Sequence, residues 1–411
     1  GGAGSGAEGG LVADLARWRS LAAAVGATAA KLGEAFLAAT DRFPLTLNLA
    51  CLARATPDAP SGRAEGPAAP RELVARARHL MRFADAAYGS VLMSALGTYQ
   101  GSLPPAGVVA RGVEATERWC VASHLGIDEA DVKESHLVGG SLDLPSYYVA
   151  VDHSSRSVVL AVRGTSTLED VLVDLVADSK PLGGVGLPWP LPPRLPFDPD
   201  EPHGHVGMAA HADRLDTAVT PLLKRLRAEH AGYKLVLTGH SMGAGVASLL
   251  ALRMATRLEP ADEALVFACP PVAARVPWLT RRLANVHAIV VADDVVPHLS
   301  LASVEGLLRR LAVIDSCEVG GTTRLSIAAG LEPPTEGMVR AATAADAPQH
   351  LPLEVPATRL VHLRRAGESD DASGEERARL VNVERFTARL DLAPSCAVDH
   401  LQPSYQRALD A

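Results

Sequence analysis

The stretch Lys234-Leu-Val-Leu-Thr-Gly-His-Ser-Met-Gly-Ala-Gly-Val-Ala-Ser-Leu-Leu-Ala-Leu252 decides the fold of this chain. Its first residues form a short apolar run typical of a buried strand, and the residues from Met242 onward are small or apolar, as in a closely packed helix. Between the two lies a G-x-S-x-G pattern, residues 239–243, which is typical of a nucleophile elbow. Glycine is expected at both ends of such a turn because a side chain there would collide with the neighbouring strand or helix. We therefore predict that Ser241 is a nucleophile at the edge of a sheet.

Size and composition predict one large α/β domain with an N-terminal helical extension. The chain has 411 residues, of which 48% are hydrophobic and only 4% aromatic, so Ala, Leu and Val must fill the core. The formal net charge is -8 and no basic stripe is present, which argues against nucleic-acid binding. The five cysteines are scattered and show no C-x-x-C spacing, so we expect reduced, mostly buried thiols and an intracellular location rather than a disulfide framework or a metal site.

Membrane attachment is left open by the sequence. No run reaches the roughly 18 apolar residues that a spanning helix needs. The chain begins Gly-Gly-Ala-Gly-Ser-Gly without a methionine, so an upstream anchor or targeting segment stays possible.

The pattern along the chain separates residues 1–70, a flexible start and helical extension with a linker, from a main domain over residues 71–411. The main domain has alternating strand and helix signals. Strands are expected at 146–151, 157–162, 235–237, 264–267, 286–291, 358–363 and 379–386, and helices at 71–87, 208–230, 242–252 and around Tyr405. The first two strands are joined by a polar turn and predict a hairpin. The alternation as a whole predicts a mostly parallel sheet covered by helices on both faces.

Two stretches break these patterns. Residues 180–203 hold many prolines, which forbid helix and central strand alike, and they also carry Trp189 and Phe197. A long apolar loop of this kind is often a lid, and we expect these two aromatic residues to contact substrate or cover the site. Residues 318–356 are rich in Gly, Ala, Pro and Thr, and we expect a mobile insertion there.

A serine nucleophile needs a base, and the base needs an acid that orients it. In the α/β-hydrolase arrangement the order along the chain is Ser, then Asp or Glu, then His. The strand at 286–291 is followed by Asp293 and Asp294, at the carboxyl edge where open α/β sheets build their sites. Successive strand residues point to opposite faces, so only one of the two carboxylates should face the base.

Four histidines follow the acid. His298 is too close to it to act independently, His350 falls in the expected insertion, and His362 lies inside an expected strand, where a structural role is the default. His400 precedes the last helix and lies beyond the last strand, so we predict that His400 is the base. His240, inside the elbow, points elsewhere and is expected to be structural.

An oxyanion hole should complete the site. One donor is expected from the backbone N–H of Met242, the residue after the nucleophile. A second is expected from an earlier loop after a strand, and the turn at 163–165 fits, with Thr165 offering its N–H and its hydroxyl.

Several of these motifs together resemble one family. They are Ala161-Val-Arg-Gly-Thr165, Gly204-His-Val-Gly-Met208, the elbow, Asp294-x-Val-Pro297 and Asp399-His400. Over roughly residues 72–411 the chain resembles the class 3 (fungal-type) lipases, and more narrowly the diacylglycerol lipases. The resemblance implies an α/β-hydrolase fold, with a lid at the proline-rich loop.

Matched motif to motif, the resemblance implies nucleophile Ser241, acid Asp294, base His400 and oxyanion donors Thr165 and Met242. Two departures stand out. His298 takes the place of an arginine usual in relatives, and the transmembrane helices of the animal enzymes have no counterpart here.

The resemblance implies a serine lipase that cleaves an ester of a glycerolipid, with diacylglycerol as the first expectation, at a membrane or lipid-droplet surface. Such a protein would be peripherally associated with lipid and needs no cofactor, no metal and no nucleic acid. Two alternatives stay open: a phospholipase or galactolipase A1, and a catalytically silent lipase-like signalling scaffold. The sequence gives no indication of oligomeric state.

Overall fold

The structure is a computed structural model, and it describes residues 39–56, 66–138, 144–165, 179–181, 203–255, 260–274, 285–344, 351–366, 377–393 and 395–411. Trp189 and Phe197, expected in a lid, lie outside these residues, and so does most of the expected N-terminal extension.

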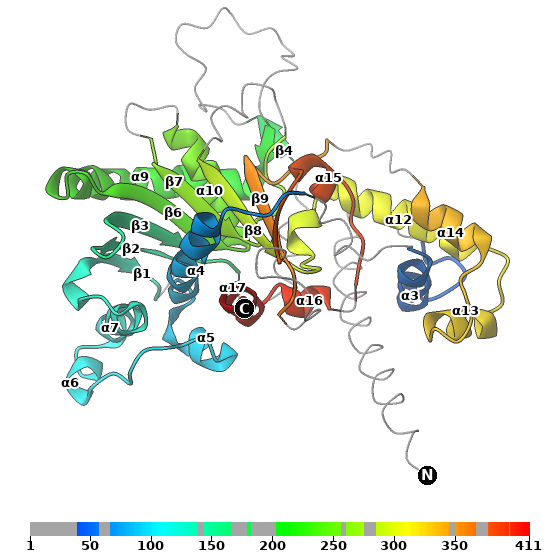
Figure 1. Ribbon diagram of the computed structural model, residues 1–411, viewed down its shortest axis with the longest axis horizontal. Coiled ribbons are helices and arrows are strands. Elements are labelled where there is room, and N and C mark those ends of the chain that lie inside the picture. Colours follow the sequence, from blue (N-terminus) through cyan, green and yellow to red (C-terminus); the bar gives the residue numbers. More distant parts are fainter. Residues whose placement is uncertain are drawn as a thin grey trace, which may run out of the picture.

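One twisted sheet organises the described part of the chain (Figure 1). Its strand order is β1-β2-β3-β6-β7-β8-β9-β10. The strands are β1 (Val132–His136), β2 (Tyr147–Asp152), β3 (Ser157–Val162), β6 (Lys234–His240), β7 (Glu263–Phe267), β8 (Val286–Val291), β9 (Arg359–Leu363) and β10 (Ala378–Val381). The run from β3 to β9 is parallel, whereas β1, β2 and β10 are antiparallel to their neighbours. This is the mostly parallel sheet of an α/β-hydrolase fold, as the sequence predicted. A separate short ribbon pairs β4 (Ser179–Pro181) with β5 (His203–His205).

Helices cover both faces of the sheet. Alternate strand residues point to opposite faces, and they enter two different apolar clusters. Leu235 and Leu237 of β6 pack into the first cluster with helices α9 (Val206–Glu229) and α10 (Met242–Met254). Val236 packs into the second cluster with α4 (Arg71–Ala86), α7 (Val113–Leu125) and α17 (Gln402–Asp410). The core is therefore two apolar layers with β6 near their centre.

The remaining helices are short or lie at the margins. They are α5 (Gly89–Leu96), α6 (Ala106–Val109), α15 (Val383–Thr387), α16 (Cys396–Asp399) and the 3-10 turns η2 (Glu129–Asp131) and η3 (Val296–His298). The predicted hairpin of β2 and β3 is confirmed. The strand expected at 379–386 was too long: it ends at Val381, because the Asn382 side chain accepts a hydrogen bond from the Arg385 N–H and begins α15.

The segment at 318–356, expected to be a mobile insertion, contains regular structure. Helices α13 (Gly321–Ala328) and α14 (Glu336–Thr343) make up about half of its described residues. With α12 (Leu301–Ser316) and α3 (Leu45–Ala55) they form a helical unit beside the sheet (Figure 1, yellow and blue, right). Ile327 and Met338 are fully buried in the first apolar cluster. Contacts therefore cross residue 70, where composition placed the boundary of the main domain.

Buried polar groups fix this helical unit. The Asp315 carboxylate accepts hydrogen bonds from the Asn48 side chain, at 2.6 Å, and from the backbone N–H of Phe43, at 2.9 Å. The fully buried Arg324 donates to the Asn48 amide oxygen and to the carbonyls of Ile314 and Cys317 at the end of α12. Such carbonyls have no partner inside their own helix, so Arg324 closes α12 while joining it to α3.

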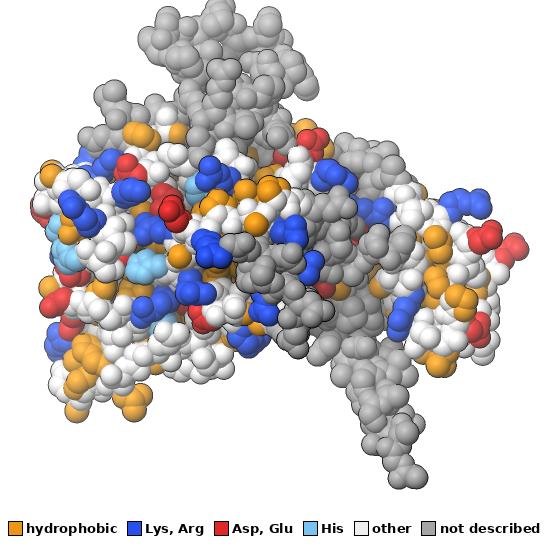
Figure 2. Space-filling model, viewed as in Figure 1, with side chains coloured by type: hydrophobic (Ala, Val, Ile, Leu, Met, Phe, Trp, Pro, Cys, Tyr) orange, Lys and Arg blue, Asp and Glu red, His pale blue; other side chains and the backbone are white. Residues whose placement is uncertain are grey.

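The surface in Figure 2 has hydrophobic side chains gathered at the corner occupied by α6. Leu103, Val109 and Val113 are 86%, 52% and 65% exposed there. α6 has four residues and none of them is buried, so this corner of the molecule adds little to the apolar core. Among the described residues, no helix combines the length and the apolar character needed to cross a bilayer.

Candidate active site

The predicted nucleophile sits at a strained turn between β6 and α10. Ser241 has φ 60° and ψ -130°, a backbone conformation that residues other than glycine rarely adopt. The flanking glycines explain how the turn closes. A Cβ on Gly239 would lie 2.7 Å from the backbone of Gly243, and one on Gly243 would lie 2.2 Å from the Val162 carbonyl oxygen. The elbow therefore needs glycine at both positions, as the sequence analysis argued.

The structure brings the other two predicted residues to this serine. His400 follows α16 directly, and its Nε2 lies 3.0 Å from Ser241 Oγ. Its Nδ1 lies 3.0 Å from Asp294 Oδ1 and 3.2 Å from Oδ2. All three side chains are almost completely buried. The arrangement is a chain of hydrogen bonds from carboxylate to imidazole to hydroxyl.

Asp294 is held by groups that the sequence analysis did not name. The Tyr405 hydroxyl donates to Asp294 Oδ2 at 2.5 Å, and the Val296 N–H donates to Oδ1 at 3.0 Å. Burial alone would raise the pKa of this carboxyl, but the charge of His400 and the hydrogen bonds from His400, Tyr405 and Val296 outweigh it and hold the pKa below its usual value. Asp294 is therefore ionised beside the imidazole at neutral pH.

Asp293 lies with Asp294 in the turn after β8, and its carboxylate contacts groups other than the base. Its carboxylate lies 3.4 Å from Arg365 Nη2 and accepts from Ser395 Oγ at 3.3 Å. Of the two aspartates, Asp294 is the one whose carboxylate contacts His400, and it stays the predicted acid.

His240 contacts the backbone of His400 and the side chain of Tyr88. Its Nε2–H donates to the His400 carbonyl at 2.9 Å, and its Nδ1 accepts from the Tyr88 hydroxyl at 3.0 Å. Complete burial, followed by the nearby charge of His400, lowers the pKa of His240 to about 3. A neutral His240 thus fixes the backbone of His400, in keeping with the structural role expected for it.

The expected oxyanion donors lie next to the serine. A Cβ on Gly164 would lie only 3.1 Å from Ser241 Cβ, so the following residue, Thr165, lies close to the nucleophile. Thr165 Oγ1 is buried and has no hydrogen-bond partner within the part of the chain that the structure describes. Met242 is the first residue of α10, and the N–H groups of a first helical turn have no partner inside the helix. Thr165 and Met242 stay the predicted oxyanion donors.

The other histidines lie elsewhere. The His362 ring donates from Nε2 to the Ala292 carbonyl at 2.8 Å, and the His298 ring lies 4.7 Å from that of Phe386. His350 lies outside the described residues. In the described ranges, no group of three His, Cys, Asp or Glu side chains is placed to hold a metal ion.

A buried carboxyl, Asp85 of α4, lies behind the site. It accepts a hydrogen bond from Gln406 of α17, the neighbour of Tyr405. Burial raises the pKa of Asp85 from 3.8 to about 8, although the hydrogen bond from Gln406 partly opposes this shift. The side chain is fully buried, so the proton is retained at neutral pH.

This shift predicts a pH-dependent stability. Between about pH 4 and 8 the folded state keeps a proton that the unfolded state has lost, so the stability of the fold falls as pH rises, by up to about 1.4 kcal/mol per pH unit. Asp85→Asn is neutral at every pH and removes this loss. We expect the free energy of unfolding of the variant to gain on that of the wild type between pH 5 and 8, in urea titrations. Asp410→Asn, at an exposed position, is the matched control, and a constant difference across pH for Asp85→Asn would contradict the prediction.

The fold and site define an α/β-hydrolase architecture whose elbow serine is hydrogen-bonded to a histidine and, through it, to an aspartate. Comparison with known proteins shows which family the chain is similar to. Residues 159–304 match the model of the lipase (class 3) family, which spans β3 to the start of α12. Over this segment the chain is similar to the class 3 lipases.

Curated relatives are diacylglycerol lipases. The chain is 31% identical to mouse diacylglycerol lipase-beta over 258 residues, which is 59% of this chain and 37% of the relative. It is 28% identical to human diacylglycerol lipase-alpha over 174 residues, 40% of this chain and 15% of the relative. The chain thus spans little more than a third of the length of the first relative and 15% of the second. Among solved structures, mono- and diacylglycerol lipase from Aspergillus oryzae overlays 83% of this chain and 99% of its own, with 17% identity and a TM-score of 0.47.

Proposed function

We propose that the chain is a serine lipase that hydrolyses an ester bond of a glycerolipid through an acyl-enzyme intermediate. The observation that carries this proposal is the pair of contacts made by His400, 3.0 Å to Ser241 Oγ on one side and 3.0 Å to Asp294 on the other. Ionised Asp294 accepts the Nδ1–H of His400, which leaves Nε2 as the acceptor for the serine proton. In these roles Ser241 is the nucleophile, His400 the base and Asp294 the acid.

The chemistry follows from this hydrogen-bond direction. Ser241 Oγ attacks the ester carbonyl carbon while its proton passes to His400 Nε2. The carbonyl oxygen becomes negatively charged and is stabilised by the Met242 N–H and by Thr165, whose buried hydroxyl has no other partner among the described residues. The tetrahedral intermediate collapses, and the alcohol leaves with the proton from His400. Water then attacks the acyl group by the same route, returns a proton to Ser241 and releases a fatty acid.

The substrate class is proposed from the relatives. Mouse diacylglycerol lipase-beta and human diacylglycerol lipase-alpha carry the substrate in their names, and we extend diacylglycerol to this chain as the favoured substrate. Because diacylglycerol is insoluble in water, the enzyme would meet it at a membrane or lipid-droplet surface.

Two measurements on the purified protein test the proposal. A fluorophosphonate probe reacts covalently with an activated serine, so we expect stoichiometric labelling at Ser241. Fatty-acid release is then measured from vesicles that contain diacylglycerol, phosphatidylcholine or a galactolipid, and we expect the diacylglycerol vesicles to give the largest kcat/KM. A protein that takes up no probe and releases no fatty acid would be a silent scaffold. Preferred release from either of the other lipids would instead assign a phospholipase or galactolipase A1.

A further inference from the structure

The proposed acid and base come from segments 106 residues apart, and each directly follows another aspartate. Asp293 precedes Asp294 after β8, and Asp399 precedes His400 at the end of α16. The two preceding aspartates face each other across the junction, and the Asp293 N–H donates to Asp399 Oδ2 at 3.3 Å. Any group that joins these two aspartates also sets the distance between the acid and the base.

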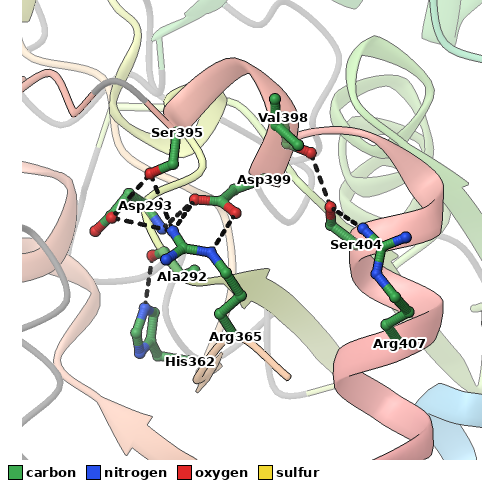
Figure 3. A network of polar contacts seen from close by, with 9 residues as sticks. All are labelled: Ala292, Asp293, His362, Arg365, Ser395, Val398, Asp399, Ser404 and Arg407. Atoms are coloured by element: carbon green, nitrogen blue, oxygen red, sulfur yellow. Dashed lines mark hydrogen bonds and ion pairs between the residues drawn. The ribbon is translucent and has the colours of Figure 1, made fainter. Parts of the chain in front are cut away.

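Arg365 joins them. It lies just beyond the end of β9, and Figure 3 shows its guanidinium between Asp293 and Asp399. Nε lies 2.9 Å from Asp399 Oδ1 and Nη2 lies 2.6 Å from Oδ2, so the arginine holds this carboxylate with two donors. Nη2 also lies 3.0 Å from Ser395 Oγ and 3.4 Å from Asp293 Oδ2. Paired donors of this kind fix orientation as well as distance.

The electrostatics favour such a clamp. The side chain of Asp399 is 2% exposed and that of Asp293 is 9% exposed, so both carboxylates are largely removed from water. Two carboxylates in contact repel each other unless a cation lies between them. Without the Arg365 guanidinium, repulsion would push the Asp399 segment, and His400 with it, away from the loop that carries Asp294.

The two joined segments have little stiffness of their own. α16 has four residues, too few for a stable isolated helix. On the other side, Ala292 has φ 46°, a strained value for alanine, and leads directly into Asp293. Direct bonds from Ser395 and Asp399 to Asp293 join the two segments, and Arg365, which belongs to neither segment, contacts both.

We propose that Arg365 is a positioning residue: by clamping Asp399 to Asp293 it keeps the His400 imidazole between Ser241 and Asp294. The inference rests on the proposed serine-lipase function, since it assigns Arg365 a role only through His400. Arg365 touches none of the three reacting side chains in the contacts described above, so it acts on geometry and not on the substrate.

The first test is Arg365→Ala, assayed on a soluble short-chain ester. A displacement of about 1 Å in a catalytic group can cost about 100-fold in rate, so we expect kcat to fall by about that factor while KM stays within about twofold. Arg364→Ala removes the same charge from the adjacent residue and should keep wild-type kcat. A folded Arg365→Ala variant with wild-type kcat would overturn the proposal. If that variant fails to fold, Arg365→Lys replaces it. Lysine cannot offer two donors in a plane, so kcat should still fall about tenfold. A wild-type kcat for Arg365→Lys would also contradict the proposal.

Chemical rescue separates positioning from a general loss of structure. Arg365 lines an open pocket of about 200 Å³ together with Ser395, Asp399, Ser404 and Arg407. Removal of the side chain enlarges this pocket, so added guanidinium chloride at low millimolar concentration can reach the carboxylates. We expect it to restore kcat of Arg365→Ala at least fivefold above a matched sodium chloride control, with no effect on Arg364→Ala. Equal rates in the two salts would reject the clamp.

A double variant tests the partner. If Arg365 acts by holding Asp399, the kcat of Arg365→Ala/Asp399→Asn should be close to that of the worse single variant, whereas multiplying losses would contradict the proposal. The variant Ser241→Ala distinguishes a failure of the Arg365 proposal from a failure of the proposed lipase function. If Ser241→Ala is inactive and Arg365→Ala is fully active, the positioning role of Arg365 is contradicted and the lipase proposal is unaffected. If Ser241→Ala is active, the proposed lipase function itself is contradicted.

Discussion

Ser241→Ala is expected to lower kcat by about 10⁶ while the protein stays folded. The loss is this large because nucleophile, base and acid act as one unit, and alanine leaves His400 Nε2 with no hydroxyl to deprotonate. The fold should tolerate the change, because alanine keeps the Cβ that the elbow already accommodates at φ 60°. The measurements are initial rates on diacylglycerol vesicles and on a soluble ester, fluorophosphonate labelling, and a thermal melt of the variant.

Ser248→Ala is the matched control for this prediction. Ser248 is another fully buried serine, in the second turn of α10, and its hydroxyl donates to the Ala244 carbonyl at 2.8 Å. We expect this variant to keep its activity and its labelling. An alanine at position 241 that retained a sizeable fraction of wild-type hydrolysis would remove Ser241 from the mechanism.

Asp294→Asn is expected to cost about 10⁴ in kcat. The introduced amide keeps one of the two hydrogen bonds that hold the carboxylate: its oxygen, in the place of Oδ2, still accepts from the Tyr405 hydroxyl, whereas the Val296 N–H, which donates to Oδ1, loses its acceptor. The NH₂ group of this amide then faces His400 Nδ1 and favours the tautomer that carries the proton on Nε2. That tautomer cannot accept the proton of Ser241. Single-turnover rates on an activated ester, in which acylation is observed directly, measure this loss.

The neighbouring aspartate provides the comparison. Asp293→Asn removes the negative charge that pairs with Arg365 at 3.4 Å and keeps an oxygen that can accept from Ser395, so we expect a loss of about tenfold or less. If the two losses were reversed, Asp293 would be the orienting acid and the register of the loop after β8 would be shifted by one residue.

The local parts of the fold could be predicted from the sequence because their causes are local. The apolar run of β6, the two elbow glycines and the small residues of α10 lie next to one another in the chain, and each restricts the others. The β2–β3 hairpin also has a local cause, since a four-residue polar stretch, 153–156, joins two apolar strands. The fold class followed from the alternation of such elements.

The helical unit could not be predicted in this way. The composition of the segment that holds α13 and α14 suggested a loose insertion, because glycine, proline and threonine are weak helix formers. Their stability comes from burial against α12 and against α3, which lies more than 260 residues earlier. Periodicity within a window of the sequence does not report a partner at that distance.

The site residues that could be predicted from the sequence are those whose order along the chain is restricted by the fold. The order serine, acid, histidine left few candidates, and the geometry brings Asp294 and His400 to Ser241; their catalytic roles stay predictions. The same order says nothing about Tyr405 or Arg365, which act on the acid and on the segments around it. Arg365 had one usable signal, its place just beyond the carboxyl end of a strand. The expected roles of Trp189 and Phe197 stay predictions as well.

The packing of α3 against α12, α13 and α14 also determines when α3 can reach its final contacts during synthesis. Asn48 is 267 residues before Asp315 and 276 before Arg324, and strands β1 to β8 all lie between them. Because a chain emerges from the ribosome with its N-terminus first, α3 is made early and waits until most of the sheet has been translated before its partners exist. Leu45, Leu49 and Leu52, buried in the finished protein, lack their final partners throughout this interval. The closing of so long a loop costs little more than that of one half its length, so the delay is a matter of time rather than of final stability. An early helix with an uncovered apolar face is the kind of segment that chaperones bind on nascent chains.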